Sequence, residues 1–137
     1  MLGCMRVTRD VVLTVGTELA WELLTDRDEL ATWLGRLDDD GSLLELDGTR
    51  RHIELDHVDA GRSIGFTWWD YDGAASRVEI TIDEHADGSR VSVTETAVAR
   101  ASAAGGSRRL ALGPAWDGRL LDLELRSLVR DPALVLV

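Results

Sequence analysis

Hydrophobic and polar residues alternate along much of the chain. The first alternating stretch is residues 6–15, where Val11, Leu13 and Val15 share one parity and Thr14 falls on the other. Alternation with a period of two residues is typical of a strand that buries one face. The sequence therefore predicts a half-buried first strand.

Five further alternating stretches follow, and short turns with glycine separate them. An Asp-Gly pair between two alternating stretches is a strong signal for a tight hairpin. The predicted strands span residues 42–46, 49–58, 63–71, 76–84 and 89–99, around the turns Asp47-Gly48, Ala60-Gly61, Asp72-Gly73 and Asp87-Gly88. We expect these strands to form an antiparallel sheet, to which the first strand adds a sixth.

Two short helices are predicted between the first strand and the rest of the sheet. Residues 18–24 carry a two-turn helical pattern. Asp26 and Glu29 then have the spacing of a capping box, which predicts a second short helix carrying Leu30, Trp33 and Leu34. We expect the two helices to support one end of the sheet.

A long C-terminal helix is predicted from Pro114 to about Arg130. Proline suits the first turn of a helix, and Asp131-Pro132 ends the run. At about 100° per residue, the helix has two apolar stripes on nearly opposite sides. The first stripe consists of Trp116, Leu120, Leu123 and Ser127, and the second of Leu121, Leu125, Leu128 and Val129. One stripe is expected to cover the sheet, and the other to meet a second surface.

The order of these elements defines the expected fold. A strand, two short helices, five strands and a long helix make an α+β domain over residues 6–130, with tails at 1–5 and 131–137. A curved six-stranded antiparallel sheet cannot close on itself, so the long helix should lie in its concave face. Such an arrangement favours a cavity between helix and sheet, and concave apolar cavities bind small molecules.

The amino-acid composition argues against several classes of function. The 137 residues carry a formal net charge of −10, which disfavours binding to nucleic acids and anionic membrane surfaces. All 15 basic residues are arginine, so lysine-dependent chemistry is excluded. One cysteine, Cys4, cannot form an internal disulfide and fits a reduced cytoplasmic protein, whose start is either Met1 or Met5. No stretch is long and apolar enough to predict a membrane span.

Few residues are candidates for catalysis or metal binding. His52 and His57 are five positions apart on one predicted strand, so they should point to opposite faces and cannot share a metal ion. His57 has the parity of Ile53 and Leu55, which predicts that it faces the cavity. His85 lies in a turn, and the acidic run at residues 38–41 lacks the further ligands of a calcium loop. We therefore predict no catalytic residue, no metal and no cofactor, and a binding protein rather than an enzyme.

The ligand-contacting residues are predicted from strand parity and from the first stripe of the long helix. They are Trp33, His57, Phe66, Trp68, Val78, Ile80, Val93, Trp116 and Leu120. For the tryptophans, packing within the core is the alternative role, and for His57 it is a satisfied inward histidine.

Several motifs, in order, resemble those of a known family. They are the run Thr17–Asp26, Trp33-Leu34-Gly35, Gly65-Phe66-Thr67-Trp68, residues 76–80, residues 88–94, and Trp116 followed by Leu120 and Leu123. The pattern is similar to that of bacterial activator-of-Hsp90-ATPase-like proteins, in the START/Bet v 1/polyketide-cyclase superfamily. The resemblance implies a helix-grip fold that binds a small hydrophobic or amphipathic molecule. It also implies two alternatives: a co-chaperone-like interaction module, and a small cyclase or hydrolase that uses the same cavity.

The second apolar stripe of the long helix is expected to pack against another protein surface. Together with the apolar tail at residues 133–137, it predicts a homodimer, because contiguous apolar patches seldom remain exposed to water. A tail folded back over the stripe is the alternative. Beyond a second copy, the expected partner is the small ligand.

Overall fold

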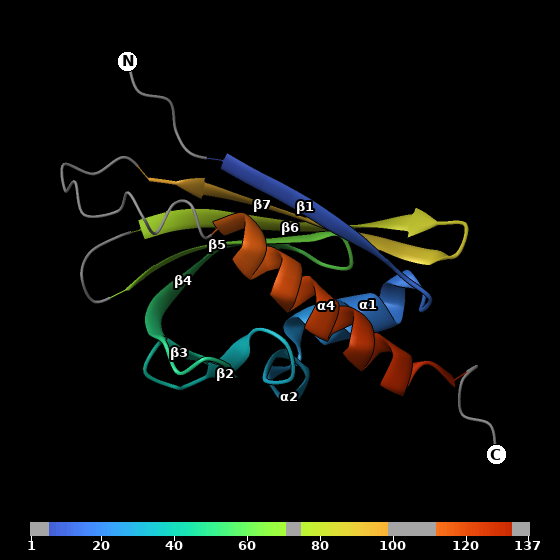
Figure 1. The fold of residues 1–137 in the computed structure, drawn as a ribbon, viewed down its shortest axis with the longest axis horizontal. Coiled ribbons are helices and arrows are strands. Elements are labelled where there is room, and N and C mark those ends of the chain that lie inside the picture. The colour runs from blue at the N-terminus through green and yellow to red at the C-terminus, as the bar shows by residue number, and fades with distance from the viewer. Residues whose placement is uncertain (1–5, 71–74, 99–111, 133–137) are drawn as a thin grey trace.

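A curled antiparallel sheet is the frame of the protein (Figure 1). The computed structural model describes residues 6–70, 75–98 and 112–132. Within them, seven strands pair in the order β1-β7-β6-β5-β4-β3-β2. Their bounds are β1 Arg6–Leu13, β2 Gly35–Leu37, β3 Ser42–Glu45, β4 Arg50–Asp59, β5 Ser63–Asp70, β6 Ala75–His85 and β7 Gly88–Ala97. The expected α+β class is confirmed.

The sheet has one strand more than the six expected. The additional strand is β2, which covers three residues and pairs antiparallel with β3, so that Gly35 lies opposite Glu45. A strand this short has no room to show an alternating pattern, which is why the sequence did not reveal it. Figure 1 shows β2 and β3 below the larger part of the sheet, where the curling β4 carries them.

Three helices accompany the sheet in the described residues. They are α1 Thr17–Thr25, α2 Arg27–Leu30 and α4 Leu112–Arg130. Helix α4 begins two residues before the predicted Pro114 and ends where predicted, at Arg130. None of these helices is long and apolar enough to cross a membrane. Tyr71, the Asp72-Gly73 turn, residues 99–111 of the connection before α4, and the tails at 1–5 and 133–137 lie outside the described residues.

Helix α4 crosses the hollow of the sheet diagonally (Figure 1), and its two stripes have opposite environments. The first stripe is buried: Trp116, Leu123 and Ser127 are 0% exposed. The second stripe faces away from the sheet, with Leu121 54% and Val129 66% exposed. The two-stripe assignment is therefore confirmed, while the homodimer expected through the second stripe stays a prediction.

Helix α2 is capped at one end and tied to α4. The Asp26 carboxylate accepts hydrogen bonds from the backbone N–H groups of Asp28 and Glu29, at 2.9 and 3.2 Å. Glu29 does not complete the predicted capping box. Its buried carboxylate instead accepts from Arg126 Nε at 2.7 Å and from Arg130 Nη1, both on α4. This network fixes the position of the short helix next to the long one.

Candidate functional site

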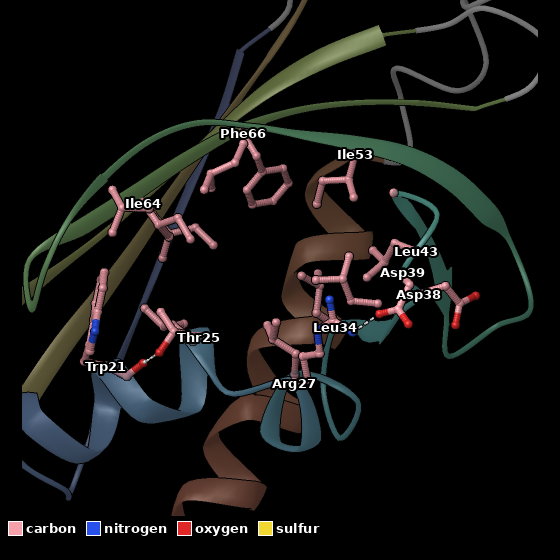
Figure 2. A pocket seen from close by; sticks show the side chains of 17 residues that line it. Trp21, Thr25, Arg27, Leu34, Asp38, Asp39, Leu43, Ile53, Ile64 and Phe66 are labelled. Atoms are coloured by element: carbon pink, nitrogen blue, oxygen red, sulfur yellow. Dashed lines mark hydrogen bonds and ion pairs between the residues drawn. The ribbon is translucent and has the colours of Figure 1, made fainter.

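A pocket of about 540 Å³ opens on the concave side of the sheet, beside α1 and α2 (Figure 2). Most of its walls are apolar. The lining residues are Trp21, Leu24, Thr25, Arg27, Leu30, Leu34, Leu37, Asp38, Asp39, Gly41, Leu43, Ile53, Leu55, Val58, Ile64, Phe66 and Ile80. No described residue of α4 is among them. The pocket is therefore placed by the curl of the sheet toward β2 and β3, and the two short helices close its lower side.

The sheet supplies one apolar wall because alternate residues of neighbouring strands point to the same face. Leu55 on β4 lies opposite Phe66 on β5. Nearer the turn between β4 and β5, Val58 lies opposite Ile64, which in turn lies opposite Ile80 on β6. This matched register gathers the side chains into a continuous surface.

Helix α1 supplies the facing wall. Trp21, Leu24 and Thr25 line the pocket from positions one helical turn apart. The Thr25 hydroxyl donates to the carbonyl oxygen of Trp21 at 2.8 Å, so its hydrogen-bonding capacity is used within the helix. In Figure 2, Trp21 and Ile64 lie at one end of the pocket, and Asp38 and Asp39 at the other. The pocket thus has an apolar end and a charged end.

Charged groups surround the second end. Arg27 Nη1 donates to Asp39 Oδ1 at 2.8 Å, and both residues line the pocket. Asp38 accepts from Arg50 Nη1 at 3.2 Å and lies 3.3 Å from Arg36 Nε. The charged end therefore consists of ion pairs, with Arg27 as the cation that lines the cavity.

Two apolar residues of β4 stand half exposed at the opening. Leu55 is 58% and Val58 49% exposed, and both line the pocket. The pairing of β3 with β4 ends at His52, so residues 54–59 have no strand beside them on that edge within the described chain. Exposed apolar side chains gathered at a cavity are typical of a binding surface.

The structure brings only part of the predicted contact set to this pocket. Phe66 and Ile80 line it. The others, apart from His57, are buried in the core and make no part of its wall: Trp33, Trp68, Val78, Val93, Trp116 and Leu120. Trp33, for instance, donates its indole N–H to the carbonyl oxygen of Leu23 at 2.8 Å. Packing, the alternative role for the tryptophans, describes the surroundings of Trp33 beside α1 and of Trp68 and Trp116 between α4 and the sheet.

The inward orientation predicted for His57 is wrong. A register shift between Leu55 and His57 inserts Asp56 as an extra residue, so His57 lies opposite Gly65 rather than following the parity of Ile53. Such a bulge moves the following side chains to the other face. His57 Nε2 lies 2.8 Å from Glu79 Oε1 on the outer face, across Gly65, whose missing side chain leaves room for this pair.

A buried carboxylate that was not among the predicted site residues lies against the first turns of α4. Glu95 on β7 is 1% exposed. Its Oε1 accepts from Trp116 Nε1 at 2.7 Å, and its Oε2 accepts from Trp68 Nε1 at 2.8 Å and from the Ser76 hydroxyl. Val91 and Val93 face the core, and Glu95 has the same parity. The alternating pattern therefore indicates an inward Glu95.

Two arginines cover the outer side of these indoles. The Arg51 guanidinium lies 4.2 Å from the centre of the Trp68 ring, and that of Arg119 lies 4.6 Å from the Trp116 ring. Both arginines donate to the buried Glu45, at 2.5 Å from Arg51 Nε and 2.6 Å from Arg119 Nη2. Two carboxylates and two guanidinium groups thus lie together with the two indoles between α4 and the sheet.

Metal binding finds no support in the described residues. They contain no group of three or more His, Cys, Asp or Glu side chains arranged to hold an ion. The acidic residues 38–40 each bind a side chain of the protein: Asp38 binds Arg50, Asp39 binds Arg27 and Asp40 binds Ser42. Asp40 accepts from the backbone N–H and the hydroxyl of Ser42, and these two bonds are the main reason that the pKa of Asp40 lies below its usual value.

The fold and the sequence each match known proteins. The arrangement is similar to DynU16, from the dynemicin biosynthetic locus, with 22% identity and a TM-score of 0.75 over 93% of this chain and 48% of that one. It is similar to MLL2253 from Mesorhizobium loti, with 17% identity and a TM-score of 0.76 over 92% and 98% of the two chains. An AHSA1 protein from Silicibacter pomeroyi matches at 19% identity and a TM-score of 0.69, over 91% of this chain and 99% of its own.

These structural likenesses show a shared helix-grip fold. This chain spans about half the length of DynU16. The family model for activator of Hsp90 ATPase homolog 1-like proteins matches residues 15–109. The chain therefore belongs to that family, as the resemblance implied. A search of curated protein sequences found no match.

Proposed function

We propose that the protein binds a small apolar or amphipathic molecule in the pocket beside α1 and α2. The observation that carries this proposal is the cavity of about 540 Å³, with apolar walls and half-exposed Leu55 and Val58 at its opening. Ligand pockets commonly have volumes of about 300–1,000 Å³ and a mostly apolar lining with a few polar groups. Both properties are present here.

The proposed site differs from the expected one in its position. Binding directly between α4 and the sheet would require Trp68 and Trp116 to move apart, although both donate to Glu95 and their rings stack with centroids 6.0 Å apart. Ligand binding next to β4 requires no such rearrangement. The proposed ligand therefore contacts α1, α2 and the curled part of the sheet.

The comparisons supply background support. DynU16 belongs to a biosynthetic locus, which is compatible with a role in handling small molecules. The co-chaperone alternative and the cyclase or hydrolase alternative rest on family resemblance, and no contact among the described residues favours either. A reduced cytoplasmic setting is part of the same proposal, since the chain has one cysteine.

The test uses N-phenyl-1-naphthylamine, a neutral apolar probe whose fluorescence rises on leaving water. Wild-type protein is expected to bind it saturably. Leu55→Asp places a charge at the pocket opening and should weaken binding by about tenfold, equivalent to about 1.4 kcal/mol. Leu125→Asp is the matched control, because Leu125 is 52% exposed on the outer stripe of α4 and Leu55 is 58% exposed.

Equal stability of both variants in thermal unfolding would establish that they fold alike. Wild-type affinity in the Leu125 variant together with weak binding in the Leu55 variant would support the pocket. Absence of saturable binding by the wild type, or equal weakening in both variants, would contradict it.

A further inference from the structure

We propose that the ligand of this pocket carries a carboxylate, which binds the Arg27 guanidinium while the apolar part of the molecule lies toward Trp21. This inference rests on the proposed function and adds the chemical class of the ligand. It follows from the division of the pocket into an apolar and a charged end (Figure 2) and from the unequal engagement of the charged groups.

Among the residues that the structure describes, Arg27 is the cation that lines the cavity. It is the first residue of α2, and its long side chain reaches the pocket from below (Figure 2). A guanidinium group carries five N–H donors in a planar fork that matches a carboxylate. Within the described chain, the hydrogen bond of this guanidinium is from Nη1 to Asp39. Further donors are therefore available to an acceptor inside the pocket.

Asp39 is a partner that a ligand can replace. Its side chain is 94% exposed, whereas that of Arg27 is 57% exposed. The carboxylate of Asp39 therefore projects into water, and the guanidinium lies closer to the protein surface. Exposed ion pairs are weak, with a typical contribution of about 0–1 kcal/mol. A ligand carboxylate would return Asp39 to full hydration and gain a guanidinium partner at the edge of the pocket.

The other acidic groups at this end already have partners. Asp38 has Arg50 and Arg36 beside its two oxygens, and its side chain is 31% exposed. Asp40 accepts two hydrogen bonds from Ser42. A cationic head group would thus find Asp39, whose carboxylate is already paired with Arg27. Arg27 keeps further N–H donors, and these favour an anionic head group.

The shape of the pocket agrees with an amphipathic acid. Its apolar wall extends from the charged end past Phe66 to Ile64 and Trp21 (Figure 2). An acyl or aromatic body along this wall would place its carboxylate near Arg27 without burying the charge. A polar group held at the edge of an apolar cavity fixes the orientation of a ligand.

Competition against N-phenyl-1-naphthylamine tests the inference with decanoate, 1-decanol and decylammonium at neutral pH, each below its aggregation concentration. Decanoate is expected to bind about threefold more tightly than decanol, because it gains a charge-assisted hydrogen bond to an exposed guanidinium. Arg27→Gln should remove this preference, with decanoate losing more affinity than decanol. Arg36→Gln is the control, since Arg36 is also exposed beside the acidic residues but does not line the pocket.

Asp39→Asn gives a second test with the opposite sign. Removing the competing carboxylate should strengthen decanoate binding and leave decanol binding unchanged. Equal affinities of decanoate and decanol in the wild type, tightest binding of decylammonium, or an equal loss for all probes in Arg27→Gln would overturn the carboxylate assignment while the pocket itself stands. Failure of the wild type to bind any probe, N-phenyl-1-naphthylamine included, would instead reject the proposed function.

Discussion

Trp116 on α4 donates its indole N–H to Glu95 on β7 at 2.7 Å, and this bond joins the first turns of the long helix to the sheet. Glu95 is 1% exposed and also accepts from Trp68 and Ser76. A buried carboxylate is tolerated when donors surround it. The three donors therefore make Glu95 an anchor for the first turns of α4.

Replacing Glu95 with Gln should destabilise the protein. The amide keeps the shape of the side chain, but its NH₂ group cannot accept, so a buried donor loses its partner. The expected loss is about 1–3 kcal/mol in the free energy of unfolding. Urea unfolding followed by tryptophan fluorescence measures it.

The matched control is Glu84→Gln, at the exposed end of β6. Its effect should remain within about 0.5 kcal/mol. A Glu95→Gln variant as stable as this control would show that the hydrogen bonds of Glu95 do not anchor the helix.

Glu29 holds the other end of α4, through Arg126 and Arg130. Glu29→Gln should cost about 1–2 kcal/mol, less than a fully buried ion pair, because the two arginines are about one-third exposed. A double-mutant cycle with Arg126→Gln isolates the pairwise energy. A coupling energy of zero would mean that the ion pair contributes nothing to stability.

Two glycine substitutions should change stability in opposite directions. Gly88 has a φ of +148°, and a Cβ there would lie 2.2 Å from the carbonyl oxygen of Leu13, a backbone atom that cannot move away easily. Gly88→Ala should therefore cost more than about 1 kcal/mol. Gly118 lies within α4, and a Cβ there meets nothing within 4 Å. Gly118→Ala should stabilise the protein by about 0.5–1 kcal/mol.

Thermal unfolding of the two variants gives the comparison directly. If Gly88→Ala were as stable as the wild type, the β6–β7 turn would have to adopt another backbone conformation. A loss of stability in Gly118→Ala would show that the outer face of α4 is more crowded than described.

The Asp47-Gly48 hairpin predicts a pH dependence. The Thr49 backbone N–H donates to Asp47 Oδ1 at 2.9 Å, and this bond is the main cause of a pKa of Asp47 below its ordinary value. A lowered native pKa stabilises the folded state at pH values above the ordinary pKa, and this contribution disappears as pH falls through the native pKa. Asp47→Asn should therefore reduce stability at neutral pH.

The reduction should shrink as the pH falls below the ordinary pKa of an aspartate and through the lower native one, since the wild-type carboxyl then also becomes neutral. Urea unfolding at a series of pH values measures both proteins. A difference in unfolding free energy that stays constant with pH would exclude the carboxylate as its cause.

The elements of the fold were predictable because each has a strong local signal. Asp47-Gly48 and Asp87-Gly88 mark hairpins that the structure contains, and the buried stripe of α4 follows helical periodicity. The three-residue β2 and the register shift after Leu55 have no such signal, since both depend on pairing with a neighbouring strand. That shift is why His57 faces outward.

The position of the pocket was harder to predict than its chemistry. Apolar walls followed from strand parity, as Phe66 and Ile80 show. The direction in which the sheet curls decides which of these residues border empty space, and curl is a tertiary property. Trp21 and Arg27 were missed as lining residues for the same reason, because their roles depend on how α1 docks against β6 and β7, and α2 against β2.

Methyl NMR during titration with N-phenyl-1-naphthylamine tests the central claim most directly, because the probe shifts the resonances of methyl groups near its rings. We expect saturable shifts for Ile53 and Ile64 in the pocket, with Leu121 and Leu125 on the outer face of α4 unchanged. Shifts confined to Leu121 and Leu125, or no shift at all, would contradict binding in the pocket.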